Sequence, residues 1–268
     1  MKTEELSALF DRQLRIEIEH HGMQREVLPH VVRFVRPAPG MSYVLYSRLD
    51  ETNVDTVIQE QIDYFTRLDL QFEWKVYDHD TPPDLKDRLI AYGFTPEDPD
   101  AVMVLDLQDA PPTLLEPVTA DVRSIKHRSQ LDDVIKVEEQ VWGRNFDWIT
   151  ERLGDHLEVP GYLSVYVAYV DGQPACSGWV YYHANSQFAS LWGGSTVSDY
   201  RKRGLYTALL ATRAQEAVRR GYRFLTIDAS PMSHPIVAQH GFRLLTYAHA
   251  CEWKRTGKEE GEGMKDEG

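Results

Sequence analysis

Apolar positions in the second half of the chain follow two spacings, one typical of strands and one typical of helices. Three apolar, β-rich runs are separated by Asp171-Gly172 and Asn185-Ser186, and both dipeptides favour hairpin turns. We therefore expect antiparallel strands over residues 163–169, 174–182 and 188–197. From about 205 to 220, apolar residues recur on one helical face and predict a helix that Gly221 can end.

Shorter elements are predicted on both sides of these strands. They are a strand over 120–125, a helix over 131–141, a strand over 224–227, a brief helix, a Gly241-Phe242 turn and a last strand over 248–253. The order strand, helix, three antiparallel strands, helix, strand, helix, strand is typical of an α/β (α+β) fold. We expect a mixed, mostly antiparallel sheet flanked by helices.

The first half of the chain repeats part of this order. Strand, helix, strand, helix and strand are predicted over 43–46, 54–65, 72–77, 85–91 and 101–107. Gly93-Phe94 follows the short helix here, as Gly241-Phe242 does in the second half. The repeated order favours an internal duplication, with chance similarity between common α/β patterns as the alternative.

Two breaks divide the chain. Pro111 and Pro112 lack N–H donors and restrict their neighbours, so we place a domain boundary there. The end of the chain is rich in Gly and Glu and cannot bury apolar surface, which predicts disorder. The predicted parts are a domain over 1–110, a linker over 111–117, a second domain over 118–253 and an acidic tail over 254–268.

Composition and charge narrow the classes of partner. Hydrophobic residues make up 42% and charged residues 26%, which is typical of a globular protein with a sizeable core. The net charge of -13 repels phosphate backbones, so we expect no nucleic-acid partner and favour a cationic or neutral small molecule. The start has no apolar signal segment, and no run approaches the ~18 apolar residues of a membrane span. These features predict a cytoplasmic protein without a membrane partner.

Metal chemistry has no support in the sequence. Cys176 and Cys251 stand in no CxxC motif or Cys/His cluster, and we expect both to be buried thiols. The histidines at 20, 21 and 30 are spaced too irregularly, without carboxylate support, to predict a metal site.

One basic turn differs from the rest of this acidic chain. Arg201, Lys202, Arg203 and Gly204 connect a predicted strand to a predicted helix. The first turn of a helix leaves N–H groups without internal partners and carries partial positive charge, so an anion binds well there. Glycine, which has no Cβ, lets the backbone approach that anion. The turn therefore predicts a pyrophosphate site, with a solvated basic turn as the alternative.

Through this turn and its place in the order of elements, the sequence resembles the GNAT superfamily of acyl-CoA N-acyltransferases. The pyrophosphate loop of that family has the pattern Gln/Arg-x-x-Gly-x-Gly/Ala, and Arg201 and Gly204 stand at its first two fixed positions. Tyr206 replaces the last small residue. The resemblance extends over roughly 118–253, and the first half is similar to a degenerate GNAT-like copy, as in a tandem form.

The resemblance implies a substrate and a place for it. Acetyl-CoA is the expected acyl donor, with pantetheine along the backbone of 191–197 and the diphosphate on the N–H groups of 203–207. The implied reaction is direct transfer of the acetyl group to an amine of a small molecule or peptide. The residues expected to bind acetyl-CoA are Trp192, Ser195, Thr196, Val197, Arg201, Lys202, Arg203, Gly204, Leu205, Tyr206 and Thr207.

Two residues that this family often uses are absent. Val237 stands near the place of a general-acid tyrosine, and Ser230 stands near that of an asparagine. The chemically capable proton donors are Ser233, His234 and Tyr206, each with turn polarity or core packing as the alternative. The candidates for a general base are Glu138, Glu139, Asp147 and His183, with an ordinary surface position as the alternative for each.

Aromatic residues near the candidate bases suggest an acceptor pocket. Trp142, Phe146 and Trp148 could surround a cation next to the carboxylates, or could simply anchor a pair of helices. Two other functions stay open. One is a non-catalytic acyl-CoA-binding regulatory module, which the missing tyrosine favours, and the other is a structural protein whose basic turn contacts an acidic partner.

The first half is expected to hold no second acyl-CoA site. Its counterpart of the basic turn, residues 48–53, has no glycine, and Asp50 and Glu51 would repel a phosphate. Thr52 or Asn53 is instead a suitable cap for the helix that follows.

Overall fold

The computed structural model describes residues 1–38 and 40–254. The described residues form two compact units. The first contains the described residues within 1–102, 228–232 and 244–254, and the second contains residues 103–227 and 233–243. The tail predicted over 254–268 lies outside the described residues except for Lys254.

The sheet of the first unit has the strand order β1-β2-β3-β4-β12, and β5 pairs with β12. β3 and β4 run parallel, and the other neighbours run antiparallel. The strands are β1 (Gln24–Val27), β2 (Val31–Val35), β3 (Ser42–Ser47), β4 (Phe72–Tyr77), β5 (Thr95–Pro96) and β12 (Arg243–Trp253). The helices are α1 (Thr3–Phe10), the π-helix η1 (Asp11–Ile16), α2 (Val54–Arg67) and α3 (Leu85–Ala91).

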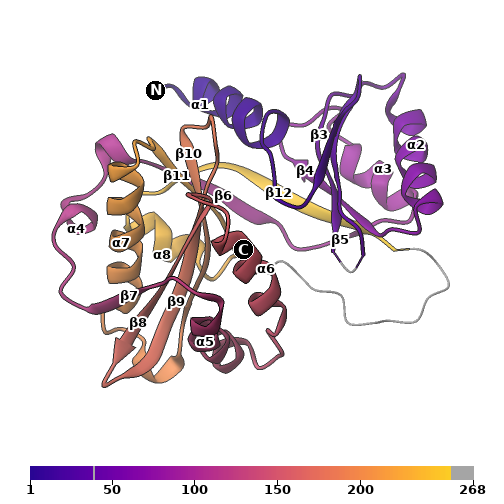
Figure 1. Ribbon diagram of the computed structural model, residues 1–268. Coiled ribbons are helices and arrows are strands. Elements are labelled where there is room, and N and C mark those ends of the chain that lie inside the picture. The colour runs from indigo at the N-terminus through magenta and orange to yellow at the C-terminus, as the bar shows by residue number, and fades with distance from the viewer. Residues whose placement is uncertain (39, 255–268) are drawn as a thin grey trace. The chain divides into compact units, whose positions relative to one another are not determined.

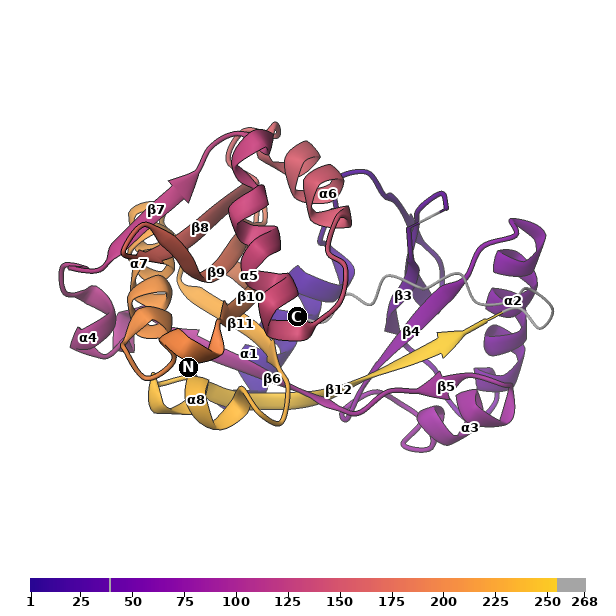
Figure 2. The same cartoon turned by 90° about the horizontal axis from the view of Figure 1, so that it is seen from below.

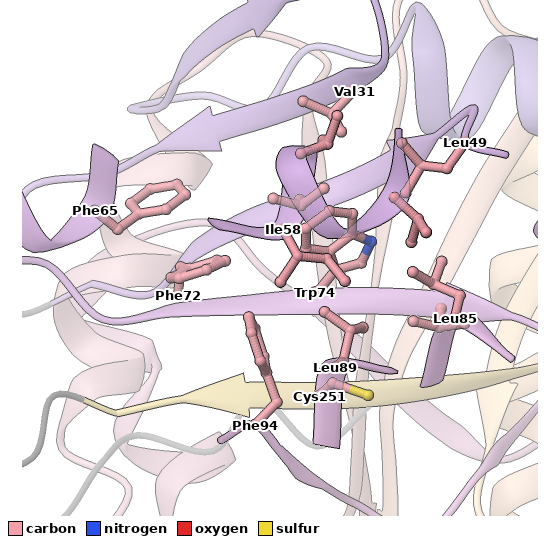
Figure 3. Close-up of a cluster of buried hydrophobic side chains, with 14 residues drawn as sticks. Val31, Leu49, Ile58, Phe65, Phe72, Trp74, Leu85, Leu89, Phe94 and Cys251 are labelled. Carbon is pink, nitrogen blue, oxygen red and sulfur yellow. The ribbon is translucent and has the colours of Figure 1, made fainter. Parts of the chain in front are cut away.

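The core of the first unit lies where α2 and α3 cover one face of this sheet (Figure 3). Along β4, Phe72 and Trp74 are fully buried, whereas Glu73 between them is partly exposed. This alternation is expected for a strand with helices on one face. Phe65 of α2 stacks on Phe72 with ring centroids 4.2 Å apart. Each such buried side chain stabilises the fold by about 1.5–3 kcal/mol.

The sheet of the second unit has the order β6-β11-β10-β9-β8-β7. Its strands are β6 (Asp100–Asp106), β7 (Asp121–Ile125), β8 (Leu163–Val170), β9 (Gln173–Tyr182), β10 (Phe188–Thr196) and β11 (Phe224–Ala229). The longer helices are α5 (Asp132–Trp142), α6 (Trp148–Leu157) and α7 (Leu205–Arg219). The shorter ones are η2 (Leu107–Asp109), α4 (Pro112–Leu115), η3 (Arg128–Gln130), η4 (Ser198–Tyr200) and α8 (His234–Gln239).

In this second unit, α7 covers one face of the sheet, and α5 and α6 cover the other (Figures 1 and 2). Two adjacent residues of β9 show the alternation. A Cβ placed on Gly178 would meet Leu209 of α7, whereas Ser177 is bonded to Glu138 of α5. Successive side chains of a strand point to opposite faces, so the two helices lie on opposite sides.

The predicted fold class is confirmed, because a mixed and mostly antiparallel sheet is flanked by helices in each unit. Two strands pair differently from the sequence-based expectation. The strand expected over 101–107 in the first half is β6, which neighbours β11 in the sheet of the second unit. The last strand was expected to complete the second half, but residues 248–253 of β12 pair antiparallel with β4 of the first unit. None of the helices in the described part of the chain is both long enough and apolar enough to span a membrane.

Candidate functional site

The central feature of the second unit is an unpaired stretch of strand edge. β10 and β11 pair in parallel only where Phe188–Ser190 meets Phe224–Thr226. From Leu191 to Thr196, the recorded strand partners of β10 among the described residues are all on β9. The N–H and C=O groups on the other edge of β10 can therefore pair with an extended ligand, as an added strand would.

A β-bulge interrupts β10 along this edge. The register with β9 shifts between Gly193 and Ser195, and both glycines of the bulge have positive φ, +66° at Gly193 and +100° at Gly194. A Cβ built on Gly194 would lie 3.1 Å from Cε2 of Tyr206. Tyr206 thus occupies the space that a side chain at 194 would need. The glycine at 194 therefore makes room for the tyrosine at 206, where the GNAT pattern has a small residue.

The basic turn follows directly on this strand and leads into α7. Its residues 201–204 are exposed, and Gly204 is the residue before the helix, with φ of +76° and no side-chain cap. Arg201 Nε donates to the carbonyl of Thr196 at 3.1 Å, which ties the turn to the end of β10. Lys202 also has positive φ. The start of α7 therefore has no side-chain cap and directly follows three exposed basic residues.

A buried carboxylate lies on the opposite face of β10. Glu138 of α5 is only 2% exposed. Ser177 Oγ donates to its Oε1 at 2.6 Å, and Ser195 Oγ donates to its Oε2 at 2.7 Å. The indole N–H of Trp142 points to Glu138 Oε2 and to Ser195 Oγ, at 3.1 Å each. Burial raises the pKa of Glu138, although the three hydrogen bonds and Arg144 oppose the shift.

Two of the candidate bases, Glu138 and His183, are buried and so do not occupy the surface positions that the alternative interpretation gave them. Glu138 is buried because its position on α5 faces the sheet, and His183 is buried at 5% exposure near the end of the β9–β10 hairpin. His183 Nε2 lies 2.7 Å from Ser190 Oγ, and burial lowers the pKa of His183 to about 4. His183 is therefore neutral at pH 7.

The remaining candidates lie in other surroundings. Glu139 is partly exposed, and Asp147 is exposed with its carboxylate bonded to Asn145. Ser233 and His234 lie at the start of α8 and are partly exposed. Val237 of α8 is fully buried, so the place of the family tyrosine is part of the core. At the end of α8, His240 Nε2 lies 3.4 Å from Thr207 Oγ1 in the first turn of α7.

The aromatic residues near Glu138 were predicted either to form an acceptor pocket or to anchor a pair of helices, and they differ in which role they fit. Phe146 is 5% exposed and belongs to the core between α5, α6 and the sheet, as the anchoring alternative proposed. Trp148 packs against the same core. Trp142 is 42% exposed, so its ring faces solvent while its indole N–H is bonded inward.

A buried arginine that the sequence analysis missed lies under α7. Arg213 is 0% exposed, and its Nη1 donates to the carbonyls of Trp179 and Trp192 at 3.3 Å each. Its Nη2 has no acceptor among the described residues, and burial lowers the pKa of its guanidinium. Arg213 stands four residues after Leu209 and four before Ala217, so its place on the apolar face of the predicted helix was the signal that could have found it.

Metal ligands do not gather anywhere in the described residues: no group of three or more His, Cys, Asp or Glu side chains there could hold an ion. Both cysteines are buried and free, and burial raises the pKa of Cys176 to about 11.

Comparison with known proteins agrees with this geometry. Residues 116–229 match the family described as Acetyltransferase (GNAT) domain. A GCN5-related N-acetyltransferase from Kribbella flavida is similar in fold with 13% identity, covering 94% of this chain and 96% of its own, at a TM-score of 0.67. A functionally unknown conserved protein from Staphylococcus epidermidis has 12% identity, covers 87% and 94%, and has a TM-score of 0.64.

A tandem GNAT protein from the clavulanic acid biosynthesis pathway, solved without AcCoA, has 13% identity, covers 91% of this chain and 87% of its own, and has a TM-score of 0.62. No match was found among curated proteins. At such identities the structural matches concern the fold, and they extend over both halves of the chain, in support of the predicted duplication. The match at 116–229 assigns this part of the chain to the GNAT acetyltransferase family. Acyl transfer from an acyl-CoA donor is the general activity that this membership supports.

Proposed function

We propose that the second unit is an N-acetyltransferase that moves the acetyl group of acetyl-CoA directly to an amine of a small molecule or peptide. The observation that carries the proposal is the unpaired edge of β10, which leads into the uncapped, basic start of α7. An extended amide chain and a diphosphate are the two ligand groups that suit these two neighbouring features.

In this proposal, pantetheine pairs with the backbone of 191–197, and the diphosphate accepts hydrogen bonds from the N–H groups of 203–207. Arg201, Lys202 and Arg203 supply positive potential in a chain of net charge -13. The amine attacks the thioester carbonyl carbon, the new C–N bond forms, and the C–S bond breaks to release the CoA thiolate. Charge-assisted hydrogen bonds to a diphosphate are about twice as strong as neutral ones, so the turn accounts for much of the donor affinity.

The acceptor is proposed to be a cationic amine before it loses its proton. Two observations favour this class: the negative net charge of the chain and the exposed ring of Trp142, which can lie against an ammonium group. The alternative, a regulatory module that binds acyl-CoA without turnover, is favoured by the buried Val237 in place of a tyrosine.

Titration calorimetry of the full chain with acetyl-CoA, followed by a thiol-release screen against an amine library, tests both readings. The proposal expects one acetyl-CoA per chain and acceptor-dependent release of free CoA. Binding without release by any amine would support the regulatory module instead. The absence of binding would refute both, and a stoichiometry near two would place a second site in the first unit.

A further inference from the structure

The buried carboxylate of Glu138 is not explained by an ion pair. Its three bonded donors are the hydroxyls of Ser177 and Ser195 and the indole N–H of Trp142. Arg144 also acts on it electrostatically and lowers its pKa. Burying a carboxylate is expensive without a fully bonded cation, and an apolar or amide side chain would join α5 to the sheet at lower cost. The carboxylate at this place therefore calls for a functional reason.

Ser195 connects this carboxylate to the proposed acyl site. It lies directly after the bulge of β10, on the stretch whose outer edge lacks a strand partner. Its hydroxyl donates its proton to Glu138 Oε2 at 2.7 Å and accepts from Trp142 Nε1 at 3.1 Å. A hydroxyl has two lone pairs, so one is left to accept a proton from a third group.

The geometry points to a proton path in which Ser195 contacts the acceptor amine and Glu138 receives the proton through it. This inference rests on the proposed acetyl transfer. As the amine nitrogen bonds to the thioester carbon, its N–H bond breaks and the proton passes to Ser195 Oγ. The proton of Ser195 moves at the same time to Glu138 Oε2, and the C–S electron pair leaves with the CoA thiolate. The proton on Glu138 then returns through Ser195 to that thiolate, which restores the carboxylate.

The surroundings of Glu138 suit this role. β9 contributes Ser177 and the thiol of Cys176, β10 contributes Ser195, and the segment after α5 contributes Arg144. Burial raises the pKa of Glu138 toward the working range of a base. Trp142 is 42% exposed while its indole N–H is bonded to both Glu138 and Ser195, so its ring is available to an incoming amine.

Three variants distinguish a proton path from a purely structural role, in which Glu138 only joins α5 to the sheet. Ser195→Ala removes the relay hydroxyl, and Glu138→Gln keeps the shape without the base. Ser164→Ala removes the bond from another buried serine to a different carboxylate, Glu216 of α7. We expect Ser195→Ala and Glu138→Gln to lower kcat about 100-fold or more, which is the usual contribution of a general base. The KM for acetyl-CoA is expected to change little. Ser164→Ala serves as the matched control, with a kcat within a few-fold of the wild type.

The pH profile of the reaction distinguishes the two roles, because it would not change if Glu138 only held α5 against the sheet. The wild-type kcat/KM should fall on the acidic side with the titration of Glu138, and Glu138→Gln should lose that limb. Equal losses in the two serine variants, or an unchanged limb in Glu138→Gln, would overturn the proton path while leaving acetyl transfer intact. If the wild type binds acetyl-CoA but acetylates no amine, the proposed function and the path fail together. Should Glu138→Gln unfold, the comparison of the two serine variants still decides.

Discussion

The turns before α2 and α7 stand at corresponding places in the two halves, but their side chains are arranged differently. Neither helix has a side-chain cap, so the cap expected at Asn53 is absent. Before α2, Asp50 Oδ1 accepts from the N–H of Thr52 at 2.8 Å and of Asn53 at 3.2 Å. Asn53 Oδ1 accepts in return from the N–H of Asp50 at 2.9 Å. Before α7, Gly204 has no side chain that could cap the helix, and the three residues before it are basic. One turn is closed by its own side chains, and the other is open to an anion.

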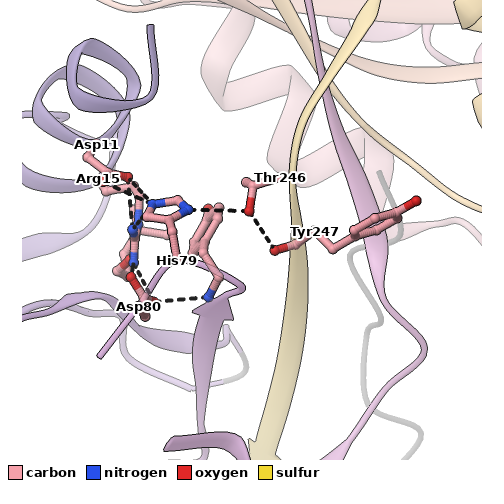
Figure 4. A network of polar contacts seen from close by, with 8 residues as sticks. Asp11, Arg15, His79, Asp80, Thr246 and Tyr247 are labelled. Atoms are coloured by element: carbon pink, nitrogen blue, oxygen red, sulfur yellow. Dashed lines mark hydrogen bonds and ion pairs between the residues drawn. The ribbon is translucent and has the colours of Figure 1, made fainter. Parts of the chain in front are cut away.

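The same contrast holds for the two fully buried arginines. In the first unit, Arg15 makes a bidentate pair with Asp80 at 2.8 Å, bonds to Asp11 at 2.8 Å and lies 3.9 Å from the ring centroid of Tyr77 (Figure 4). In the second unit, Arg213 reaches only backbone carbonyls at 3.3–3.4 Å. Arg15 is thus bonded to carboxylates of its own unit, whereas Nη2 of Arg213 has no acceptor among the described residues.

Removal of Arg15 is expected to have the largest effect on the unfolding free energy, because Arg15 is the buried arginine that pairs with carboxylates. Arg15→Met leaves Asp80 buried without its cation, and breaking a buried ion pair in this way costs about 3–5 kcal/mol. Arg213→Met orphans no carboxylate and removes a poorly compensated charge, so we expect its unfolding free energy to stay within about 1 kcal/mol of the wild type. Urea unfolding followed by circular dichroism measures both. Equal destabilisation would show that the contrast between the two arginines has no energetic meaning.

Gly204→Val tests the open turn directly. A β-branched residue is strained at φ of +76° and keeps a phosphate away from the N–H groups. We expect acetyl-CoA affinity to weaken by about 1 kcal/mol or more, which is about fivefold in Kd. Gly172→Val is the matched control, since Gly172 has φ of +78° in a hairpin turn and likewise no neighbour within 4 Å of an added Cβ. Calorimetry on both variants decides, and equal affinities would move the phosphate site away from this turn.

The order of elements in the second half was predictable because each feature rests on local chemistry. The hairpin turns at 171–172 and 185–186, the helix beginning at Leu205 and the glycine before it all follow from short-range rules. The partner of β12 was not predictable, since its alternating side chains fit any open sheet edge and only tertiary packing selects β4. The strands β1 and β2 were missed because their runs are short and interrupted by charged residues at 25, 26 and 33.

The candidate site was predictable in part, for a similar reason. The basic turn carries its signal within four adjacent residues. The cluster of Glu138, Ser177 and Ser195 does not, because its members come from three elements and meet only after the sheet has formed. A glutamate at a helical position that faces apolar neighbours is the one local sign of this cluster.

Arg203→Gln is expected to have a smaller effect, which depends on salt. Arg203 is exposed at the start of α7, and Arg219, exposed at the end of the same helix, is its matched control. Exposed charges are screened over a Debye length of about 10 Å at 0.1 M salt. Arg203→Gln should therefore weaken acetyl-CoA binding more at low salt than at high salt, and Arg219→Gln should not. A loss in Arg203→Gln that is independent of salt would indicate damage to the turn rather than lost attraction for phosphate.

The smallest expected effect lies in the closed cluster around Arg15 and concerns pH. A hydrogen bond to Asp11 raises the pKa of His79 above its ordinary value of 6.5, against the effect of burial. Because the folded pKa is the higher one, the stabilisation is complete below pH 6.5 and is lost as the pH rises through the folded value. His79 is 34% exposed, so the contribution is that of a screened pair, about 0.2–1 kcal/mol.

His79→Gln should therefore flatten the fall in unfolding free energy above pH 6.5, and it should change the stability less at high pH than at pH 6. His21→Gln, at an exposed histidine of the same unit, should leave the slope in place. Asp11 cannot produce this slope, because its pKa is lowered from 3.8 and its stabilising charge is lost only as the pH falls through that lower value. Urea unfolding at several pH values compares the two variants. If the unfolding free energy of His79→Gln still falls above pH 6.5, the titrating group is not His79.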